Sequence, residues 1–196
     1  MRRLVLAGLF AFLPLTAAHA YDGFPAQLTE ADRARLDRFD AVRAEAIRDA
    51  ERGAAADRAV LAKVLEGDAG PIGIETLPGR WRCRTAKIGA QGDLLPLVVY
   101  PDFECRITAL PGGGLKFEKI TGSQRTSGML YPYDRDRLGY AGASWYGYEK
   151  GPKPYGTDPD RDEVGVLVRV SSTRLRLELP SPKYESMFDI IELRRR

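Results

Sequence analysis

The spacing of hydrophobic residues changes once along the chain, from a helical period to a strand period. Between 30 and 52 the apolar positions recur mostly at every third or fourth residue, which is typical of one face of an α-helix. Thr29 is a good N-cap residue before this segment, and Gly53 is a good stop after it. A second, shorter helix is predicted over 57–66, so that the two form a hairpin with one apolar face. The stripe of the first helix consists of Leu36, Phe39, Val42, Ala46, Ile47 and Ala50.

Beyond a linker rich in glycine and proline, the period shortens to two. In 174–179 basic or acidic residues alternate with leucine, which is typical of a β-strand with one buried face. Eight antiparallel strands, separated by Gly, Pro and Asp turn signals, are expected at 80–87, 95–109, 115–121, 124–133, 137–146, 164–170, 174–179 and 186–193. The fold class is therefore mainly β with an N-terminal helical hairpin (α+β). Sequential hairpins favour a lipocalin-like up-and-down barrel over a two-sheet sandwich, because closure of the barrel removes exposed strand edges.

The first twenty residues have the pattern of a secretory signal peptide. Two arginines precede an apolar run over 4–15, and Ala18-His19-Ala20 has the A-x-A form of a cleavage site. The run is too short to span a membrane, although an uncleaved N-terminal anchor is the alternative. We expect cleavage after Ala20, a periplasmic or secreted location and no stable membrane insertion. The expected organisation is a signal peptide over 1–20, a helical hairpin over 21–66, a linker over 67–79 and an antiparallel β-barrel-like domain over 80–196.

Composition excludes several kinds of chemistry for the mature chain. Cleavage removes Arg2 and Arg3, which leaves 28 of the 30 basic residues against 27 acidic ones, so the net charge falls from +3 to about +1. A net charge this small predicts no nucleic-acid partner. The single histidine, His19, leaves with the signal peptide, which excludes Ser-His-Asp, Cys-His and His-ligated zinc sites. Two cysteines are too few for an iron–sulfur cluster or a four-cysteine zinc site. We expect no cofactor.

An acidic segment has the spacing of a calcium-binding loop without its other requirements. Asp158, Asp160 and Asp162 form a D-x-D-x-D pattern. The sixth position, where such a loop needs glycine for a sharp turn, is Glu163, and the twelfth, where it needs glutamate, is Arg169. We therefore expect a solvated acidic loop and no metal site.

The two cysteines, Cys83 and Cys105, are expected to form a disulfide, because an exported protein reaches an oxidising compartment. Alternation places both on the apolar face of their strands. A tight turn at 89–92 would bring Cys83 closer to Val98 than to Cys105, so the bridge requires a longer loop or a bulge near Pro101. Two buried free thiols are the alternative.

Two groups of residues resemble known families. Gly79-Arg80-Trp81 is similar to the G-x-W opening of lipocalin-like barrels, which implies that an arginine of the last strand, Arg194, covers Trp81. A more extensive likeness, preceded by two helices, is to a family of exported bacterial proteins, domain of unknown function 4893. That resemblance implies an envelope protein and carries no established activity or site. The segments that carry this resemblance lie at 81–84 (WRCR), 103–107 (FECRI), 121–128 (TGSQRTSG), 185–186 (ES) and 191–193 (IEL).

The first candidate binding group consists of Lys119, Arg125 and Ser127. These residues share a strand face with Phe117 and Met129, two apolar residues that are expected to point inward. Buried cations need compensating partners, so the group forms either a structural polar network or a polar floor that binds the anion of a ligand. Carboxylates for a network are available on or beside the last strand, at Glu185, Asp189 and Glu192.

The second candidate group is aromatic and consists of Trp145, Tyr146, Tyr148 and Tyr155. Aromatic side chains with polar tips, at a strand end and in a loop with glycine and proline, suit recognition of sugars, peptides or proteins. The alternative is that about half of them belong to the barrel core and the rest stiffen a long loop.

We therefore expect an exported cell-envelope protein that is a non-catalytic binding module for a small polar ligand or an envelope partner. It would bind through the barrel mouth or the aromatic loop. One alternative, by analogy of fold alone, is an inhibitor of a secreted protease. Another is a hydrolase that uses carboxylates or the Lys119–Ser123 pair, although the sequence contains no S-x-x-K motif.

Overall fold

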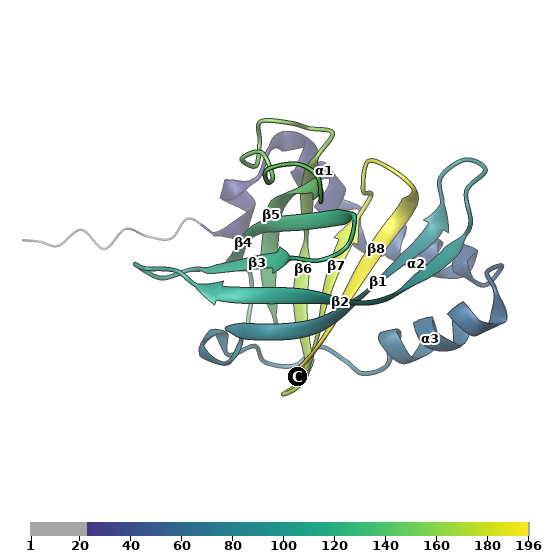
Figure 1. Ribbon diagram of the computed structural model, residues 1–196, viewed down its shortest axis with the longest axis horizontal. Helices are drawn as coiled ribbons and strands as arrows, with labels where there is room; N and C mark the ends of the chain where they lie inside the picture. Colours follow the sequence, from purple (N-terminus) through teal and green to yellow (C-terminus); the bar gives the residue numbers. More distant parts are fainter. Residues whose placement is uncertain (1–22, 196) are drawn as a thin grey trace, which may run out of the picture.

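The computed structural model describes residues 23–195 and shows a closed antiparallel β-barrel with helices packed on its outer wall (Figure 1). The strands pair in sequential order, and the last closes on the first. All eight predicted strands are confirmed, and the architecture is a barrel, not a sandwich. The predicted signal peptide and its cleavage site lie outside the described residues. The strands are β1 (Gly79–Ala90), β2 (Leu97–Ala109), β3 (Leu115–Lys119), β4 (Gln124–Pro132), β5 (Arg137–Tyr146), β6 (Asp162–Ser171), β7 (Arg174–Pro180) and β8 (Ser186–Arg195).

Three α-helices precede the barrel: α1 (Glu30–Asp37), α2 (Phe39–Ala50) and α3 (Ala55–Leu65). The predicted N-cap is confirmed, because the Thr29 hydroxyl accepts the amide of Asp32 at 3.2 Å. The first predicted helix is interrupted at Arg38, where ψ is 5°. This break allows α1 to pack on β6 while α2 packs on β1 and β8, so the helices follow the curved wall. Among residues 23–195, no helix is long and apolar enough to cross a membrane.

The helices are held to the barrel by an apolar interface and by a buried charge network. Outward-facing residues of β1 and β8 form a buried cluster with α2 and α3. Beside it, Arg43 of α2 and Arg176 of β7 both bind the carboxylate of Glu178, at 2.7 and 2.9 Å. Arg176 also donates to carbonyls at the C-terminus of α3, including that of Leu65 at 3.0 Å, where a cation complements the helix dipole. The apolar members of the interface include Val42, Ala46, Leu61, Ala86, Ile88, Phe188 and Ile190.

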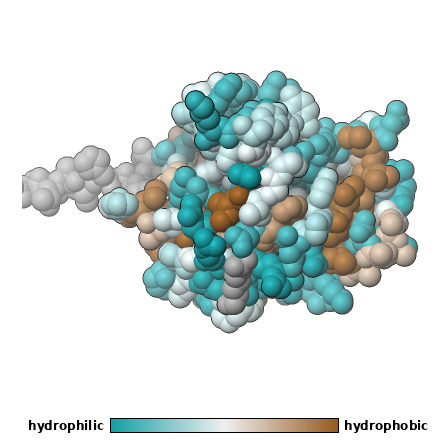
Figure 2. Space-filling model, in the orientation of Figure 1, coloured by the Kyte–Doolittle hydropathy of each residue, from teal (hydrophilic) through white to brown (hydrophobic). Residues whose placement is uncertain are grey.

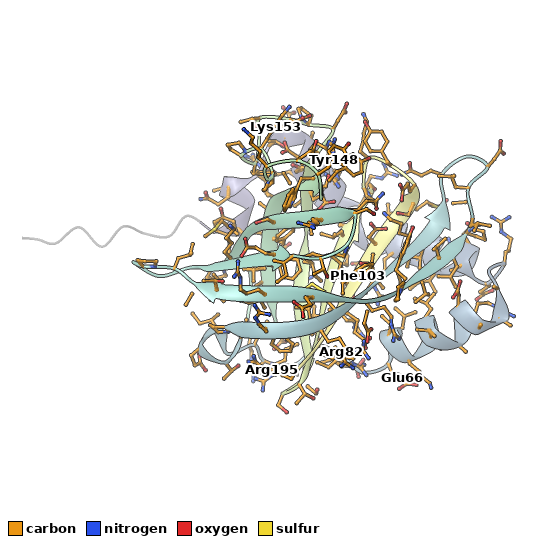
Figure 3. All side chains as sticks on the ribbon, in the orientation of Figure 1. Glu66, Arg82, Phe103, Tyr148, Lys153 and Arg195 are labelled. Atoms are coloured by element: carbon orange, nitrogen blue, oxygen red, sulfur yellow. A yellow bond between two sulfur atoms is a disulfide. The ribbon has the colours of Figure 1, made fainter. Side chains whose placement is uncertain are left out.

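One end of the barrel is filled with apolar side chains and covered by the segment that leads into β1. Leu77 of this segment is 1% exposed, and its carbonyl accepts the indole N–H of Trp81 at 3.0 Å. The guanidinium of Arg195 lies 4.1 Å from the centre of the Trp81 ring. The prediction that Arg194 covers this tryptophan was wrong by one residue, because Arg194 points outward and pairs with Asp102. Arg195 lies at the end of the barrel opposite the loop that carries Tyr148 (Figure 3).

The predicted disulfide is confirmed: Cys83 and Cys105 are bonded, with their Cα atoms 5.8 Å apart. The expected bridge needed either a longer loop or a bulge near Pro101, and both are present. The loop between β1 and β2 spans 91–96, and two residues of β2, one of them Pro101, lie opposite a single residue of β1. Together they place Cys83 opposite Phe103 and therefore diagonal to Cys105, within reach of a bridge.

Replacing an interface leucine tests whether the helices are part of the folded unit. Leu61 is 5% exposed between α3 and the barrel, so Leu61→Ala is expected to lower the free energy of unfolding by about 2–5 kcal/mol. The matched control is Leu94→Ala in the β1–β2 loop, where the side chain is 52% exposed and the expected change is below about 0.5 kcal/mol. Urea denaturation measures both. Equal, small changes would show that the helices do not stabilise the barrel.

Candidate functional site

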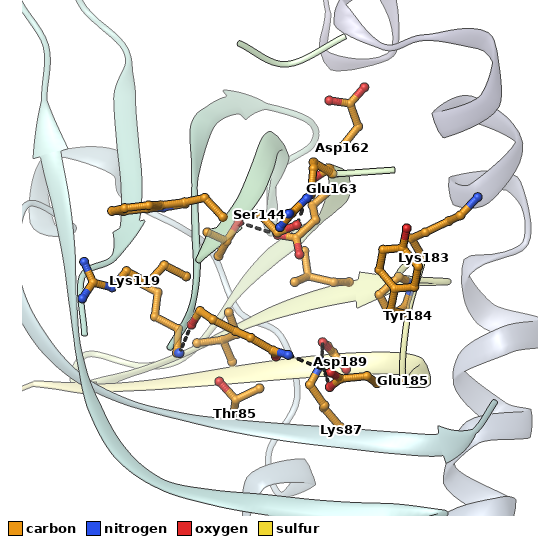
Figure 4. Close-up of a pocket in the computed structure, with 18 of the residues that line it drawn as sticks. Thr85, Lys87, Lys119, Ser144, Asp162, Glu163, Lys183, Tyr184, Glu185 and Asp189 are labelled. Atoms are coloured by element: carbon orange, nitrogen blue, oxygen red, sulfur yellow. Dashed lines mark hydrogen bonds and ion pairs between the residues drawn. The ribbon is translucent and has the colours of Figure 1, made fainter. Parts of the chain in front are cut away.

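The opposite end of the barrel is open and contains a cavity of about 90 Å³. Along several strands the inward positions change from apolar to polar toward this end. In β1, for example, Trp81 and Cys83 are followed on the same face by Thr85 and Lys87. The cavity is surrounded by ends of strands, by the β5–β6 loop (147–161) and by the β7–β8 loop (181–185). The β5–β6 loop gives this end of the barrel a largely hydrophilic surface (Figure 2). The polar residues that face the cavity interior include Thr85, Lys87, Lys119, Gln124, Thr126, Glu163 and Asp189 (Figure 4).

One charged group in the cavity, Lys87, is fully compensated. Its Nζ lies 3.0 Å from the carboxylate of Asp189 and 3.3 Å from that of Glu185. The side-chain amide of Gln124 also donates to Glu185, at 2.7 Å. Burial alone would lower the pKa of Lys87, but the two carboxylates outweigh it and raise that pKa above its ordinary value. Lys87 is therefore held as a cation within a closed set of partners.

Several charged groups at the rim and in the adjoining β5–β6 loop are also paired. Lys183 contacts Asp160 at 2.9 Å, and Lys153 contacts Asp158 at 2.8 Å. The carboxylate of Asp162 accepts the amide of Gly156 at 3.0 Å. The three aspartates of the D-x-D-x-D segment thus bind three separate partners, and no group of three metal-ligating side chains converges within residues 23–195.

Lys119, at the end of β3, is a buried cation without a carboxylate partner. Its side chain faces the cavity, and the residue is 6% exposed. Nζ donates to the backbone carbonyl of Gln124 and lies 3.8 Å from the centre of the Phe103 ring, but it forms no ion pair within the described residues. Burial, together with the positive charges of Lys87 and Arg125, lowers the pKa of Lys119 to about 8.

Glu163, at the start of β6, is the corresponding anion without a cation. Its carboxylate accepts a hydrogen bond from the Thr126 hydroxyl, which is itself 2.6 Å from the hydroxyl of Tyr140. In the part of the chain that the structure describes, no lysine or arginine forms an ion pair with it. Burial raises the pKa of Glu163 to about 7, against the hydrogen bond from Thr126, which favours the charged form.

Two further polar groups that line the cavity have no hydrogen-bond partner among residues 23–195: the hydroxyl of Thr85 and the indole N–H of Trp145. Thr85 is 8% exposed and lies opposite the bulge in β2. Its hydroxyl points into the cavity on the same side as Lys119 (Figure 4). Buried polar atoms in proteins are almost always hydrogen-bonded, so an unpaired hydroxyl in a cavity indicates a place for a ligand or solvent atom.

The structure places the predicted residues of β4 differently from the expectation. Phe117 pairs with Gly128, not Met129, so Met129 and Ser127 point outward and the predicted inward face of Ser127 was wrong. By the same alternation Arg125 also points outward, but it lies at the end of the strand. Its guanidinium is 5.0 Å from the centre of the Trp145 ring and lines the rim of the cavity. Its Nε donates to the carbonyl of Gly122 at 2.9 Å.

The predicted aromatic residues divide into three positions. Trp145 and Tyr146 line the cavity. Tyr148 is 83% exposed and stacks on Tyr146 with ring centres 5.4 Å apart. Tyr155 lies outside the cavity, where its hydroxyl donates to Asp32 at 2.6 Å and ties the loop to α1. Burial and this carboxylate raise the pKa of Tyr155 to about 12, which keeps its hydroxyl protonated as the donor to Asp32.

The carboxylates expected to compensate Lys119 have other partners. Asp189 and Glu185 bind Lys87, and Glu192 points outward to Arg174 and Arg194, at 3.8 and 3.5 Å. Thr85, Lys87 and Glu163 line the cavity but were not among the predicted site residues. Continuing the alternation of Trp81 and Cys83 along β1 would have found the first two, whereas Glu163 precedes the predicted start of its strand.

Replacing Glu163 tests its burial without charge compensation. Its folded-state pKa of about 7 lies above the ordinary value of 4.5, so the folded protein loses stability as the pH rises between these values. Glu163→Gln removes this loss. The unfolding free energy of the variant minus that of wild type should rise by at most about 3 kcal/mol between pH 5 and pH 7. Above pH 7 this difference should level off.

Urea denaturation at several pH values measures this difference. Asp160→Asn is the control, because Asp160 is exposed at the rim and pairs with Lys183 there. A difference between Glu163→Gln and wild type that does not change with pH would show that Glu163 is solvated like a surface carboxylate.

Comparison with known proteins identifies the family. A family model described as a domain of unknown function, DUF4893, matches residues 24–193. Neither a curated protein nor a solved structure matches the chain. The match spans all three helices and nearly the whole barrel, including the cavity residues. The chain therefore belongs to the DUF4893 family, whose function is unknown.

Proposed function

We propose that the protein binds a small anionic ligand in the cavity at the open end of the barrel. The observation that carries this proposal is that hydrogen-bond donors on one side of the cavity lack side-chain acceptors. The Lys119 amine has only a backbone carbonyl as acceptor, and the hydroxyl of Thr85 has no partner within residues 23–195. Leaving buried donors unsatisfied is costly, so an acceptor supplied by a ligand stabilises the complex.

The dimensions of the cavity set the size of the ligand. About 90 Å³ is well below the volume of pockets that take drug-sized molecules, so the ligand has only a few heavy atoms. Arg125 lines the rim without an ion pair among the described residues and adds positive charge at the entrance, whereas Arg161 there is paired with Glu149. We infer a small carboxylate or another compact anion, which fits the donors better than an apolar molecule does.

We further propose that the protein acts in an exported, oxidising compartment. The Cys83–Cys105 bond supports this location, because structural disulfides persist mainly outside the cytosol. A hydrolase with a Lys119–Ser123 pair receives no support from the geometry. Within residues 23–195, the Lys119 amine donates to the carbonyl of Gln124, and no hydrogen bond joins it to Ser123.

Replacing Lys119 separates binding from stability. Lys119→Met is expected to weaken binding of acetate or propionate by about 10- to 100-fold, because a charge-assisted hydrogen bond is lost. The variant should remain folded and be at least as stable as wild type without ligand, since an uncompensated buried cation is removed. Isothermal titration calorimetry and urea denaturation provide the two measurements.

Lys183→Met is the matched control, because this lysine lines the same cavity at its rim, where it is paired with Asp160. It should leave the affinity within about twofold of wild type. The proposal is overturned if wild type binds no small anion, or if Lys119→Met binds as wild type does. Destabilisation of Lys119→Met by about 3–5 kcal/mol with unchanged binding would identify Lys119 as a purely structural cation.

A further inference from the structure

The charged groups of the cavity are not all in the same state. Lys87 has two carboxylate partners, Lys183 has Asp160, and Arg161 lies 3.5 Å from Glu149. Within the described residues, Lys119 and Glu163 are the interior pair of opposite charges that lack such partners. Each is held by a neutral group instead, a backbone carbonyl for Lys119 and the hydroxyl of Thr126 for Glu163. The cavity therefore has one positive group, the Lys119 amine, and one negative group, the Glu163 carboxylate, that lack a counter-charge. We call these groups the positive and the negative pole.

The two poles do not compensate each other directly. Lys119 comes from β3 and Glu163 from β6, and two strands separate these in the barrel wall. Their charges interact across the cavity, yet no ion pair joins them. A buried charge is stabilised most effectively by a counter-charge at hydrogen-bond distance. A molecule that carries both charges and lies between the two walls would supply one to each.

The positive pole also has a second group suited to a carboxylate. The hydroxyl of Thr85 is more than nine-tenths buried, has no partner within residues 23–195 and points into the cavity on the side of Lys119 (Figure 4). A carboxylate has two oxygens, so it can accept from the Lys119 amine and the Thr85 hydroxyl at once. Glu163 accepts only the Thr126 hydroxyl among these groups, and its remaining oxygen positions can receive the N–H donors of an ammonium group.

We propose that the ligand is a small zwitterion of the α-amino acid class, with its carboxylate on Lys119 and Thr85 and its ammonium group on Glu163. This inference rests on the proposed function and specifies its ligand. An anion without an ammonium group would leave the carboxylate of Glu163 uncompensated and would add a second negative charge beside it. The cavity volume of about 90 Å³ suits an amino acid with a small side chain, such as glycine, alanine or serine.

The test compares ligands that differ in one pole. Alanine carries both charges, propionate lacks the ammonium group, and alanine methyl ester lacks the carboxylate. At pH 7.5, with the affinities measured by calorimetry, alanine is expected to bind at least tenfold more tightly than either analogue. Because this comparison uses only the wild-type protein, it does not depend on the folding of any variant.

Two variants assign the poles. Glu163→Gln should lose the preference for alanine over propionate while it still binds propionate, and Lys119→Met should weaken the binding of both. Asp160→Asn, a control at the rim, should change neither affinity. Circular dichroism melting checks that each variant is folded.

The outcomes distinguish this inference from the proposed function. If propionate binds wild type as tightly as alanine does, or if Glu163→Gln retains the preference for alanine, the zwitterion is overturned and an anion site remains. If neither alanine nor propionate binds, the proposed function and this inference both fail.

Discussion

The pairing of β8 with β1 is the contact on which the rest of the structure depends, because it converts eight strands into a closed barrel. Closure gives every strand one face that points into a confined interior. At one end that interior is filled by large apolar side chains around Trp81, Phe117 and Tyr140. At the other end the same inward positions carry charged and hydroxyl groups, so the cavity is a direct consequence of where the alternation changes from apolar to polar.

Confinement also explains the electrostatics of the site. Removing a charged group from water disfavours its ionised form, and the effect is offset only where a counter-charge lies close. Lys87 has such counter-charges and remains a cation. Lys119 and Glu163 lack them, so the pKa of Lys119 falls to about 8 and that of Glu163 rises to about 7, and both shifts favour the uncharged form of the group. Groups of this kind destabilise the empty protein and are typical of sites that interact with a ligand.

The sequence alone predicted the architecture well because its patterns are local. Alternation identified the eight strands, and the expected disulfide needed a longer loop between its two strands or a bulge near Pro101, both of which are present. The helix break at Arg38 was missed, since the apolar spacing continues through it and the break shows only in the packing of α1 and α2 on different strands.

The site was predicted only in part, because its geometry depends on register. Lys119 was placed correctly in the interior, but the pairing of Phe117 with Gly128 turned Ser127 outward. A shift of one residue likewise exchanged Arg194 for Arg195 over Trp81. Strand pattern does not determine such shifts when adjacent residues are chemically alike, and turn geometry decides them.

The premise of the proposed site is the lack of charge compensation for Lys119 and Glu163, which line the cavity without a charged partner within residues 23–195. Carbon-detected NMR of protein labelled with ¹³C measures it directly, by following Glu163 Cδ and Lys119 Cε as the pH is varied without ligand. Without charge compensation, the expected midpoints are near 7 for Glu163 and near 8 for Lys119. Midpoints near 4.5 and 10.5, the ordinary values of the two groups, would contradict it.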